Sequence, residues 1–215
     1  MPLQVVKDEF MKPTDHSIFG IVLAAGASQR MGEPKALLAT ASGKTLLEIQ
    51  CNMLAESGCR RVAVVVGADA GTIRKALPAL SAELIVNSEW EKGQFSSLVA
   101  GIRNALSAGA CGAIILPVDA IGIPTEVVTA LIETALRNPH LEAVVPEYEG
   151  KKGHPVYLSK SFCEALAALD PGQDSARLDA QLKAACNVMG LPVNSPSVVR
   201  NINTMDDWKR FSSQT

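Results

Sequence analysis

The stretch FGIVLAAGASQRMGEPKALL (residues 19–38) contains an apolar run, a loop of small residues with basic side chains, and a second apolar run. The first run is typical of a strand buried on both faces of a parallel sheet. A glycine-containing loop directly after such a strand lies at the carboxyl edge of the sheet, where open parallel sheets bind their ligands. The stretch therefore predicts the first strand of an α/β domain and a ligand-binding loop beside it.

Strand-like and helix-like segments alternate along the rest of the chain. This alternation predicts a three-layer α/β fold, a mostly parallel twisted sheet with helices on both faces. The expected strands are rich in valine and isoleucine and nearly continuous in apolarity, and they cover residues 18–24, 61–67, 82–87, 112–118, 142–148 and 186–193. The expected helices cover residues 45–57, 71–80, 95–108 and 124–138, with Thr45 and Thr125 as helix-start residues.

The chain has 215 residues, which fits one medium-sized domain. No linker, repeat or low-complexity tract divides it, so we expect a single domain over residues 18–215. Residues 1–17 mix charges of both signs and are expected to form a flexible extension. Residues 146–182 break the regular alternation, and we expect them to form an excursion away from the sheet.

Composition excludes several classes of protein. The 20 basic and 22 acidic side chains are scattered along the chain, so no nucleic-acid footprint is present. The longest apolar runs have only the length of a strand, which argues against a membrane span or a signal peptide. The five cysteines are an odd number without a C-x-x-C pair and are expected to be buried, reduced thiols of a cytoplasmic protein: Cys51, Cys59, Cys111, Cys163 and Cys186.

The first loop matches neither common nucleotide motif. Gly26 begins no G-x-G-x-x-G fingerprint, and SGKT at residues 42–45 lacks the first glycine of a P-loop, so it reads as a turn and a helix start. Small residues let backbone N–H groups approach an oxyanion, and two cations along the loop neutralise a polyphosphate. The loop is therefore predicted to bind a triphosphate through Ala24, Ala25, Gly26, Ser28, Arg30 and Lys35. The alternative is a surface turn with two solvated cations.

Asp119 directly follows the apolar strand AIILPV. Its carboxylate is expected at the carboxyl edge of the sheet, on the same side as the first loop, where a Mg²⁺ ion that bridges phosphates would lie. The alternative is that Asp119 caps the next helix, although Pro124 starts that helix five residues later.

The segment LAAGASQRMGEPKALL resembles the L-A-A-G-x-S-x-R-M-G-x-x-K-x-L-L signature of the MobA-like nucleotidyltransferases, in particular the branch with molybdenum cofactor cytidylyltransferase. Further stretches fit in order, so the resemblance covers nearly the whole chain from residue 18: NSEWEKGQFSSLVAGI, LPVDAIGIP, GHPVYLS and NINTMDDW. It implies a Rossmann-like nucleotidyltransferase fold of the GT-A type. It also implies an enzyme that moves a nucleoside monophosphate and releases pyrophosphate.

The resemblance assigns roles to several residues. Leu23, Asn87, Gly93 and Ser97 join the nucleotide-binding residues, although Ser97 is as well explained as a helix cap. Asp119 becomes a metal ligand, with Asn203 of the stretch N-I-N-T as the second. Many relatives carry aspartate at the position of Asn203, so a neutral carbonyl would replace a carboxylate there; Asn203 is equally well explained as a helix cap.

The excursion is predicted to lie on the acceptor side of the site. His154 in KKGHPVY, together with Lys151, Lys152 and Arg177, could supply positive charge for an anionic acceptor, and we expect His154 and Arg177 to bind it. The alternative is a solvated basic turn with a structural histidine.

Together these features predict a Mg²⁺-dependent nucleotidyltransferase in which Arg30, Lys35 and Asp119 carry catalysis. Arg30 and Lys35 would hold the β- and γ-phosphates, and the acceptor phosphate is anionic at neutral pH, so no general base is needed. L-A-A-G resembles the cytidylyl branch and L-A-G-G the guanylyl branch, so CTP is expected before GTP. Molybdopterin is the expected acceptor and a molybdoenzyme or cofactor-delivery protein the expected partner.

Three alternative functions stay open at this point. The first is a GTP-using molybdopterin guanylyltransferase, and the second is a cytidylyltransferase for a sugar phosphate or alcohol phosphate. The third belongs to a different class: a nucleotide-binding module with weak catalysis, which the neutral side chain of Asn203 favours.

Overall fold

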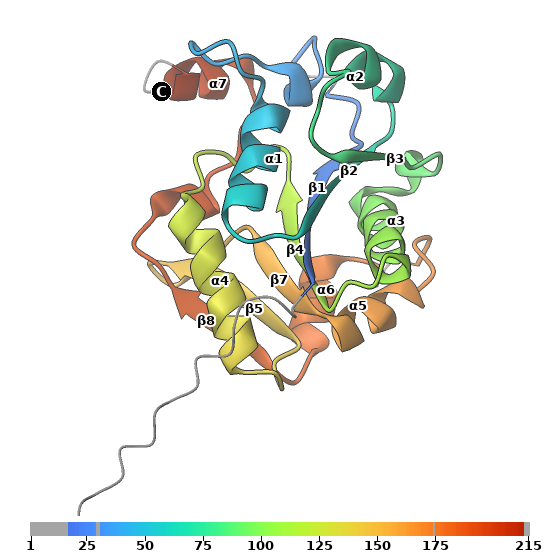
Figure 1. The fold of residues 1–215 in the computed structure, drawn as a ribbon, viewed down its shortest axis with the longest axis vertical. Coiled ribbons are helices and arrows are strands. Elements are labelled where there is room, and N and C mark those ends of the chain that lie inside the picture. The colour runs from blue at the N-terminus through green and yellow to red at the C-terminus, as the bar shows by residue number, and fades with distance from the viewer. Residues whose placement is uncertain (1–16, 29–30, 174, 213–215) are drawn as a thin grey trace, which may run out of the picture.

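The computed structural model describes residues 17–28, 31–173 and 175–212. These residues form a central sheet between two layers of helices (Figure 1). The strands lie in the order β3-β2-β1-β4-β7-β5-β6, with β8 paired to β5. Their bounds are β1 Ile18–Ala24, β2 Arg61–Val66, β3 Glu83–Val86, β4 Gly112–Pro117, β5 Ala143–Tyr148, β6 Lys151–Lys152, β7 Val156–Ser159 and β8 Val188–Pro192.

Helices cover both faces of the sheet, as the alternation predicts. The helix bounds are α1 Leu46–Glu56, α2 Ala70–Ala76, α3 Gln94–Ser107, α4 Thr125–Arg137, α5 Lys160–Ala167, α6 Leu178–Ala184 and α7 Met205–Ser212. Side chains of α1, α2 and α4 share one buried apolar cluster, whereas those of α3, α5 and α6 pack into a second. The fold class read from the sequence is therefore confirmed.

The first strand lies near the middle of the sheet. All seven residues of β1 are buried, and the strand pairs in parallel with both β2 and β4. Leu23 lies opposite Pro117 in the register between β1 and β4. The residues that follow β1 and β4 therefore leave the sheet at the same edge, which brings the first loop beside Asp119.

Helix α1 begins where the SGKT stretch ends. The Thr45 hydroxyl accepts a hydrogen bond from the Glu48 N–H, and the Glu48 carboxylate accepts one from the Thr45 N–H in return. This capping box satisfies two backbone donors at the start of the helix. SGKT is thus a turn and a helix start, as expected. Thr125 is the first residue of α4 and not its N-cap. The N-cap is Pro124, which makes no side-chain capping hydrogen bond.

The expected excursion over residues 146–182 is wrong for part of its length. Strand β7 lies inside the sheet, antiparallel to both β4 and β5, and β6 pairs with the end of β5. The chain turns back through residues 149–155 and re-enters the sheet, because Val156 and Leu158 are apolar enough to be fully covered there. Four residues are too short a run to be read reliably as a strand from their pattern. After β7 the chain leaves the sheet again through α5 and α6.

The expectations drawn from composition concern the burial of the cysteines and the length of the apolar helices. All five thiols are free, and Cys51, Cys59 and Cys163 are buried as expected. Cys111 and Cys186 are exposed, which corrects the expectation that all are buried, since both lie at the ends of elements and not inside them. Among the residues that the structure describes, no helix is long and apolar enough to cross a membrane.

Candidate active site

The loop after β1 is closed by Ser28. Its hydroxyl accepts a hydrogen bond from the Lys35 N–H at 3.0 Å, and its carbonyl accepts one from the Met31 N–H at 2.8 Å. Ser28 has φ +39°, a left-handed conformation that is uncommon for a residue with a side chain and typical of functional turns. Arg30 belongs to this loop in the sequence but lies outside the described residues, so its predicted phosphate contact stays a prediction.

Lys35 and Asp119 meet at the edge of the sheet. The Lys35 Nζ lies 3.5 Å from an Asp119 carboxylate oxygen and donates a 2.6 Å hydrogen bond to the Ile202 carbonyl. In turn the Ile202 N–H donates to the Asp119 carbonyl at 2.8 Å. Three segments far apart in the sequence thus converge here. The side chain of Lys35 is 15% exposed and that of Asp119 is 30% exposed, so both charges still reach solvent or a ligand.

A cavity of about 670 Å³ opens above these groups, and we call it the smaller cavity. Most residues predicted to bind the nucleotide or the metal line it: Leu23, Ala25, Gly26, Ser28, Lys35, Gly93, Ser97, Asp119 and Asn203. Its size is in the range of small-molecule sites. Several lining residues were not predicted as site residues, among them Met31, Glu91 and Gln94. Gln94 directly follows Gly93, a predicted nucleotide-binding residue, and this adjacency is the sequence signal that indicates Gln94 as a site residue.

Of the predicted nucleotide-binding residues that the structure describes, Ala24 and Asn87 do not line the smaller cavity. The side chain of Ala24 packs into the apolar cluster with α1 and α4. Asn87 is only 7% exposed, and its amide nitrogen donates to the hydroxyls of Ser96 and Ser97 while its carbonyl accepts from the Glu89 N–H. Its hydrogen-bonding groups are thus used inside the protein. Asn87 fixes the start of α3 and the loop before it, so it acts on the cavity through these segments and does not line it.

Gly67 lets the two loops around the smaller cavity approach each other. A Cβ at this position would lie 2.6 Å from the Ala25 carbonyl oxygen and 2.6 Å from the Trp90 Cβ. Trp90 lines the cavity from the short helix η2, Trp90–Lys92. Gly67, directly after β2, therefore determines how closely the loop between β3 and α3, which we call the second loop, packs against the first loop.

We expect Gly67→Ala to lower the free energy of unfolding by about 1–3 kcal/mol, because the added methyl overpacks a rigid contact. Gly26→Ala is the matched control, since a Cβ at Gly26 would meet nothing within 4 Å. Its free energy of unfolding should stay within about 0.5 kcal/mol of the original. Urea unfolding at unchanged m-value measures both, and equal midpoints for the two variants would contradict the packing argument.

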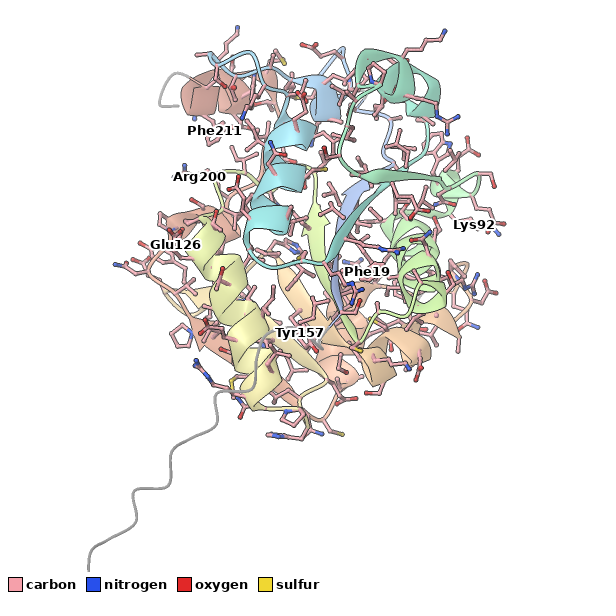
Figure 2. The ribbon with its side chains drawn as sticks, viewed as in Figure 1. Phe19, Lys92, Glu126, Tyr157, Arg200 and Phe211 are labelled. Carbon is pink, nitrogen blue, oxygen red and sulfur yellow. The ribbon has the colours of Figure 1, made fainter. Side chains whose placement is uncertain are left out.

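A second cavity of about 930 Å³, the larger cavity, adjoins the first. The two share Leu23, Gly93, Gln94 and Pro117. Its floor is apolar and comes from β1, β4, β5, β7, α3 and α6. Basic side chains reach its rim: Lys92, Lys152, Arg177 and Lys183. Figure 2 shows Lys92 on the outer surface beside α3, where its ammonium pairs with the Glu89 carboxylate.

Both residues predicted to bind the acceptor line the larger cavity. Arg177 pairs with Asp179 at 3.0 Å at the start of α6. His154 is held by its backbone, because its N–H donates to the Val198 carbonyl at 2.8 Å. Among the described residues, the buried His154 Nδ1 finds no hydrogen-bond partner. Burial lowers the pKa of His154, and the negative charge of Asp119 offsets part of that effect, so the imidazole is neutral at neutral pH.

The residues present suit a metal ion that a nucleotide would bring with it. Asp119 supplies one carboxylate to the smaller cavity and Asn203 one amide oxygen. In the described part of the chain no group of three histidine, cysteine, aspartate or glutamate side chains is placed to hold a metal by itself. Mg²⁺ is commonly bound by one or two carboxylates together with substrate phosphates and water, which this donor set fits.

The fold and the site define a class of protein. The site combines a strand-to-loop turn of small residues with a lysine and a carboxylate at the carboxyl edge of a mostly parallel sheet. A second cavity lies next to the first. This arrangement is suited to transfer between two bound substrates. The chain belongs to the family of the MobA-like NTP transferase domain, whose model matches residues 20–185. It is thus a nucleotidyltransferase.

Individual relatives are distant. The chain is 30% identical over 195 residues to a protein named probable molybdenum cofactor guanylyltransferase of Mycobacterium avium, covering 90% of this chain and 94% of the relative. It is 28% identical over 166 residues to nicotine blue oxidoreductase of Paenarthrobacter nicotinovorans, covering 75% of this chain and 80% of the relative. Among solved structures, Rv0371c of Mycobacterium tuberculosis H37Rv superposes with a TM-score of 0.75 at 25% identity, covering 93% of this chain and 100% of that one.

Proposed function

We propose that this protein transfers a nucleoside monophosphate from CTP or GTP to the phosphate of an acceptor, with Mg²⁺ as the cofactor. The 3.5 Å approach of the Lys35 ammonium to the Asp119 carboxylate at the smaller cavity supports this most directly. It places a cation for phosphate oxygens next to a ligand for a metal. In the reaction the acceptor phosphate oxygen forms a bond to the α-phosphorus. The bond from the α-phosphorus to the bridging oxygen breaks, and pyrophosphate leaves with the electron pair.

Lys35 and the first loop hold the triphosphate. The backbone between Ala25 and Ser28 lines the smaller cavity with small side chains, so that its N–H groups can reach phosphate oxygens. The Lys35 ammonium turns from Asp119 to the β- and γ-phosphates and stabilises the charge of the leaving pyrophosphate. Arg30 is proposed to assist from the same loop. The backbone from Ala25 to Ser28 already lines the smaller cavity, so the main rearrangement proposed for Lys35 is the turn of its own side chain.

Asp119 would hold the metal together with Asn203, which also lines the smaller cavity. Bound there, Mg²⁺ would neutralise charge on the α-phosphate and so make the phosphorus a better electrophile. Asp119 is placed for this by its position two residues after β4 and by the hydrogen bond from Ile202 to its carbonyl. Asn203 contributes no charge, so the nucleotide's own phosphates must complete the site.

The acceptor is proposed to lie in the larger cavity, with His154 and Arg177 among its contacts. The apolar floor suits a ring system better than a sugar, because sugar hydroxyls would find no partners there. The basic rim suits a phosphate. Molybdopterin has both features, and its delivery would require a molybdoenzyme or a cofactor-delivery protein as partner.

Two observations favour different donors. The L-A-A-G sequence of the first loop favours CTP. The relatives named molybdenum cofactor guanylyltransferase favour GTP, and their likeness extends over nine-tenths of the chain in the Mycobacterium avium protein. Besides the first loop, the second loop, between β3 and α3, is proposed to contact the base, because Trp90, Glu91 and Gln94 line the smaller cavity there.

Melting temperatures measured with CTP, GTP, ATP and UTP, each with Mg²⁺ or with EDTA, test the donor. At a concentration about 100 times the dissociation constant, binding adds about 2.7 kcal/mol to stability, which is several degrees for a chain of this length. We expect one of CTP and GTP to give the largest shift and Mg²⁺ to increase it. NADPH is included because one relative is named an oxidoreductase, and we expect no shift with it.

Release of pyrophosphate distinguishes an enzyme from a nucleotide-binding module. A transferase releases pyrophosphate from the preferred nucleotide when Mg²⁺ and molybdopterin are both present. A binding module with weak catalysis, which the neutral Asn203 favours, gives the melting shift without pyrophosphate. If none of the four nucleotides shifts the melting temperature, the proposed function is wrong.

A further inference from the structure

Gln50 is a buried polar residue that the site's chemistry does not yet explain. It lies in the middle of α1, on the face that packs against the sheet, and is only 3% exposed. Most buried side chains of α1 are apolar, including Leu46, Leu47 and Leu54. Burying an amide costs free energy unless its groups find hydrogen-bond partners. The position of Gln50 therefore calls for a specific set of contacts.

Those contacts surround Asp119. The Gln50 amide nitrogen lies 2.8 Å from the Ala120 carbonyl oxygen, 3.1 Å from that of Val118 and 3.4 Å from that of Pro117. One NH₂ group thus faces the carbonyls on both sides of Asp119, sharing its two N–H bonds among three acceptors. Within the part of the chain that the structure describes, the side-chain carbonyl oxygen of Gln50 has no hydrogen-bond partner. The orientation of the Gln50 side chain is therefore set by its amide N–H groups, which bind the carbonyls of this loop.

Backbone hydrogen bonds also hold the loop from Pro117 to Ala120, and one of them runs from the Val118 N–H to the Leu23 carbonyl at 3.0 Å. The Ala120 N–H donates to the Pro117 carbonyl at 3.1 Å, which closes the turn. The Ile202 N–H donates to the Asp119 carbonyl from the opposite side. With Gln50 behind and Ile202 in front, the backbone that carries the carboxylate is held between α1 and the C-terminal segment. Both of these anchors come from segments far from the loop in sequence.

We propose that Gln50 is a positioning residue for Asp119: its amide fixes the loop 117–120 so that the carboxylate faces the smaller cavity. The inference concerns the proposed metal site, and the expected effects on metal binding and rate rest on the proposed function. Gln50 itself does not line either cavity. It acts through the backbone, as outer hydrogen-bond partners of metal ligands commonly do, where their loss costs about 10- to 100-fold in metal affinity or activity.

Gln50→Met tests this, since methionine has a similar length and volume and removes the amide, whose NH₂ group makes the hydrogen bonds to the loop. Gln50→Leu is a second variant with a stiffer side chain. Thr45→Ala is the matched control: it removes the cap of the same helix and lowers stability without touching the loop. All measurements are made well below the melting temperatures of the variants.

The first measurement needs no ligand. Hydrogen exchange at the Ala120 and Ile202 N–H groups should accelerate about tenfold or more in Gln50→Met and remain unchanged in Thr45→Ala, because only the former frees the loop. Unchanged exchange at both amides in Gln50→Met and in Gln50→Leu overturns the proposal. This outcome is independent of whether the protein uses a nucleotide at all.

The second measurement is titration with Mn²⁺ in the presence of the preferred nucleotide, with pyrophosphate release alongside. We expect about tenfold weaker Mn²⁺ binding and, at saturating Mn²⁺, a kcat lowered by about tenfold with the KM for nucleotide unchanged, because Lys35 and the first loop are untouched. A lower melting temperature with normal Mn²⁺ binding and normal kcat would reduce Gln50 to a structural residue. A wild-type protein that binds no nucleotide would overturn the proposed function, while the exchange data still decide the role of Gln50.

Discussion

Lys35→Ala should weaken nucleotide binding by about 10- to 100-fold and lower the rate of pyrophosphate release by about 10²- to 10³-fold. The ammonium is the described cation that lies beside Asp119, and alanine leaves the triphosphate without it. The rate falls further than the affinity because charge on the leaving pyrophosphate develops in the transition state. Titration calorimetry with the preferred nucleotide gives the affinity, and a coupled pyrophosphate assay gives the rate.

The control for this change is Lys44→Ala. Lys44 is an exposed lysine in the turn before α1, so its removal changes the net charge equally without touching the smaller cavity. It should alter neither binding nor rate by more than about twofold, since long-range charges are screened by salt. A folded Lys35→Ala protein with the rate of the original would remove Lys35 from the mechanism and leave the task to Arg30.

The close approach of Lys35 to Asp119 is expected to couple the binding of metal to the binding of nucleotide. In the structure the ammonium lies against the carboxylate that is proposed to bind the metal, and it is anchored on the Ile202 carbonyl. A nucleotide that attracts the ammonium to its phosphates frees the carboxylate at the same time. Metal and nucleotide should therefore bind together more tightly than either does alone.

Much of this site follows from the order of apolar runs in the sequence. Residues 18–24 and 112–118 read as buried strands, and two parallel neighbouring strands end at one edge of the sheet. The sequence alone therefore predicts that the small-residue loop and Asp119 lie together. The local patterns are strong because a strand buried on both faces admits little besides apolar residues.

The contacts that complete the site carry no local signal. The hydrogen bond from Lys35 to Ile202 joins residues 167 apart, and those from Gln50 to the Asp119 loop span 67 to 70. Asn87 is a related case, because an asparagine after a strand has the same local pattern whether its amide faces a ligand or two serines. Such pairings depend on how helices and the C-terminal segment pack, which a single sequence does not encode locally.

Asp119→Asn should abolish the response to metal while leaving the nucleotide a place to bind. The amide keeps the shape of the carboxylate and removes its charge. With Mg²⁺ present we expect pyrophosphate release to fall by about 10³-fold and the metal-dependent part of the melting shift to vanish, because Asn203 alone is a weak, neutral ligand. Asp206→Asn is the control: Asp206 is an exposed aspartate in the first turn of α7 and should change neither quantity.

The experiment in EDTA gives the sharper result, since the sign of the effect reverses. Without metal, the negative carboxylate repels the triphosphate and also competes with it for the Lys35 ammonium. Asp119→Asn removes both effects, so it should bind metal-free nucleotide at least as tightly as the original protein and show an equal or larger melting shift. A nucleotide shift lost in EDTA as well as in Mg²⁺ would mean that Asp119 supports the cavity structurally. A shift that still grows with Mg²⁺ in the variant would assign the metal to another ligand.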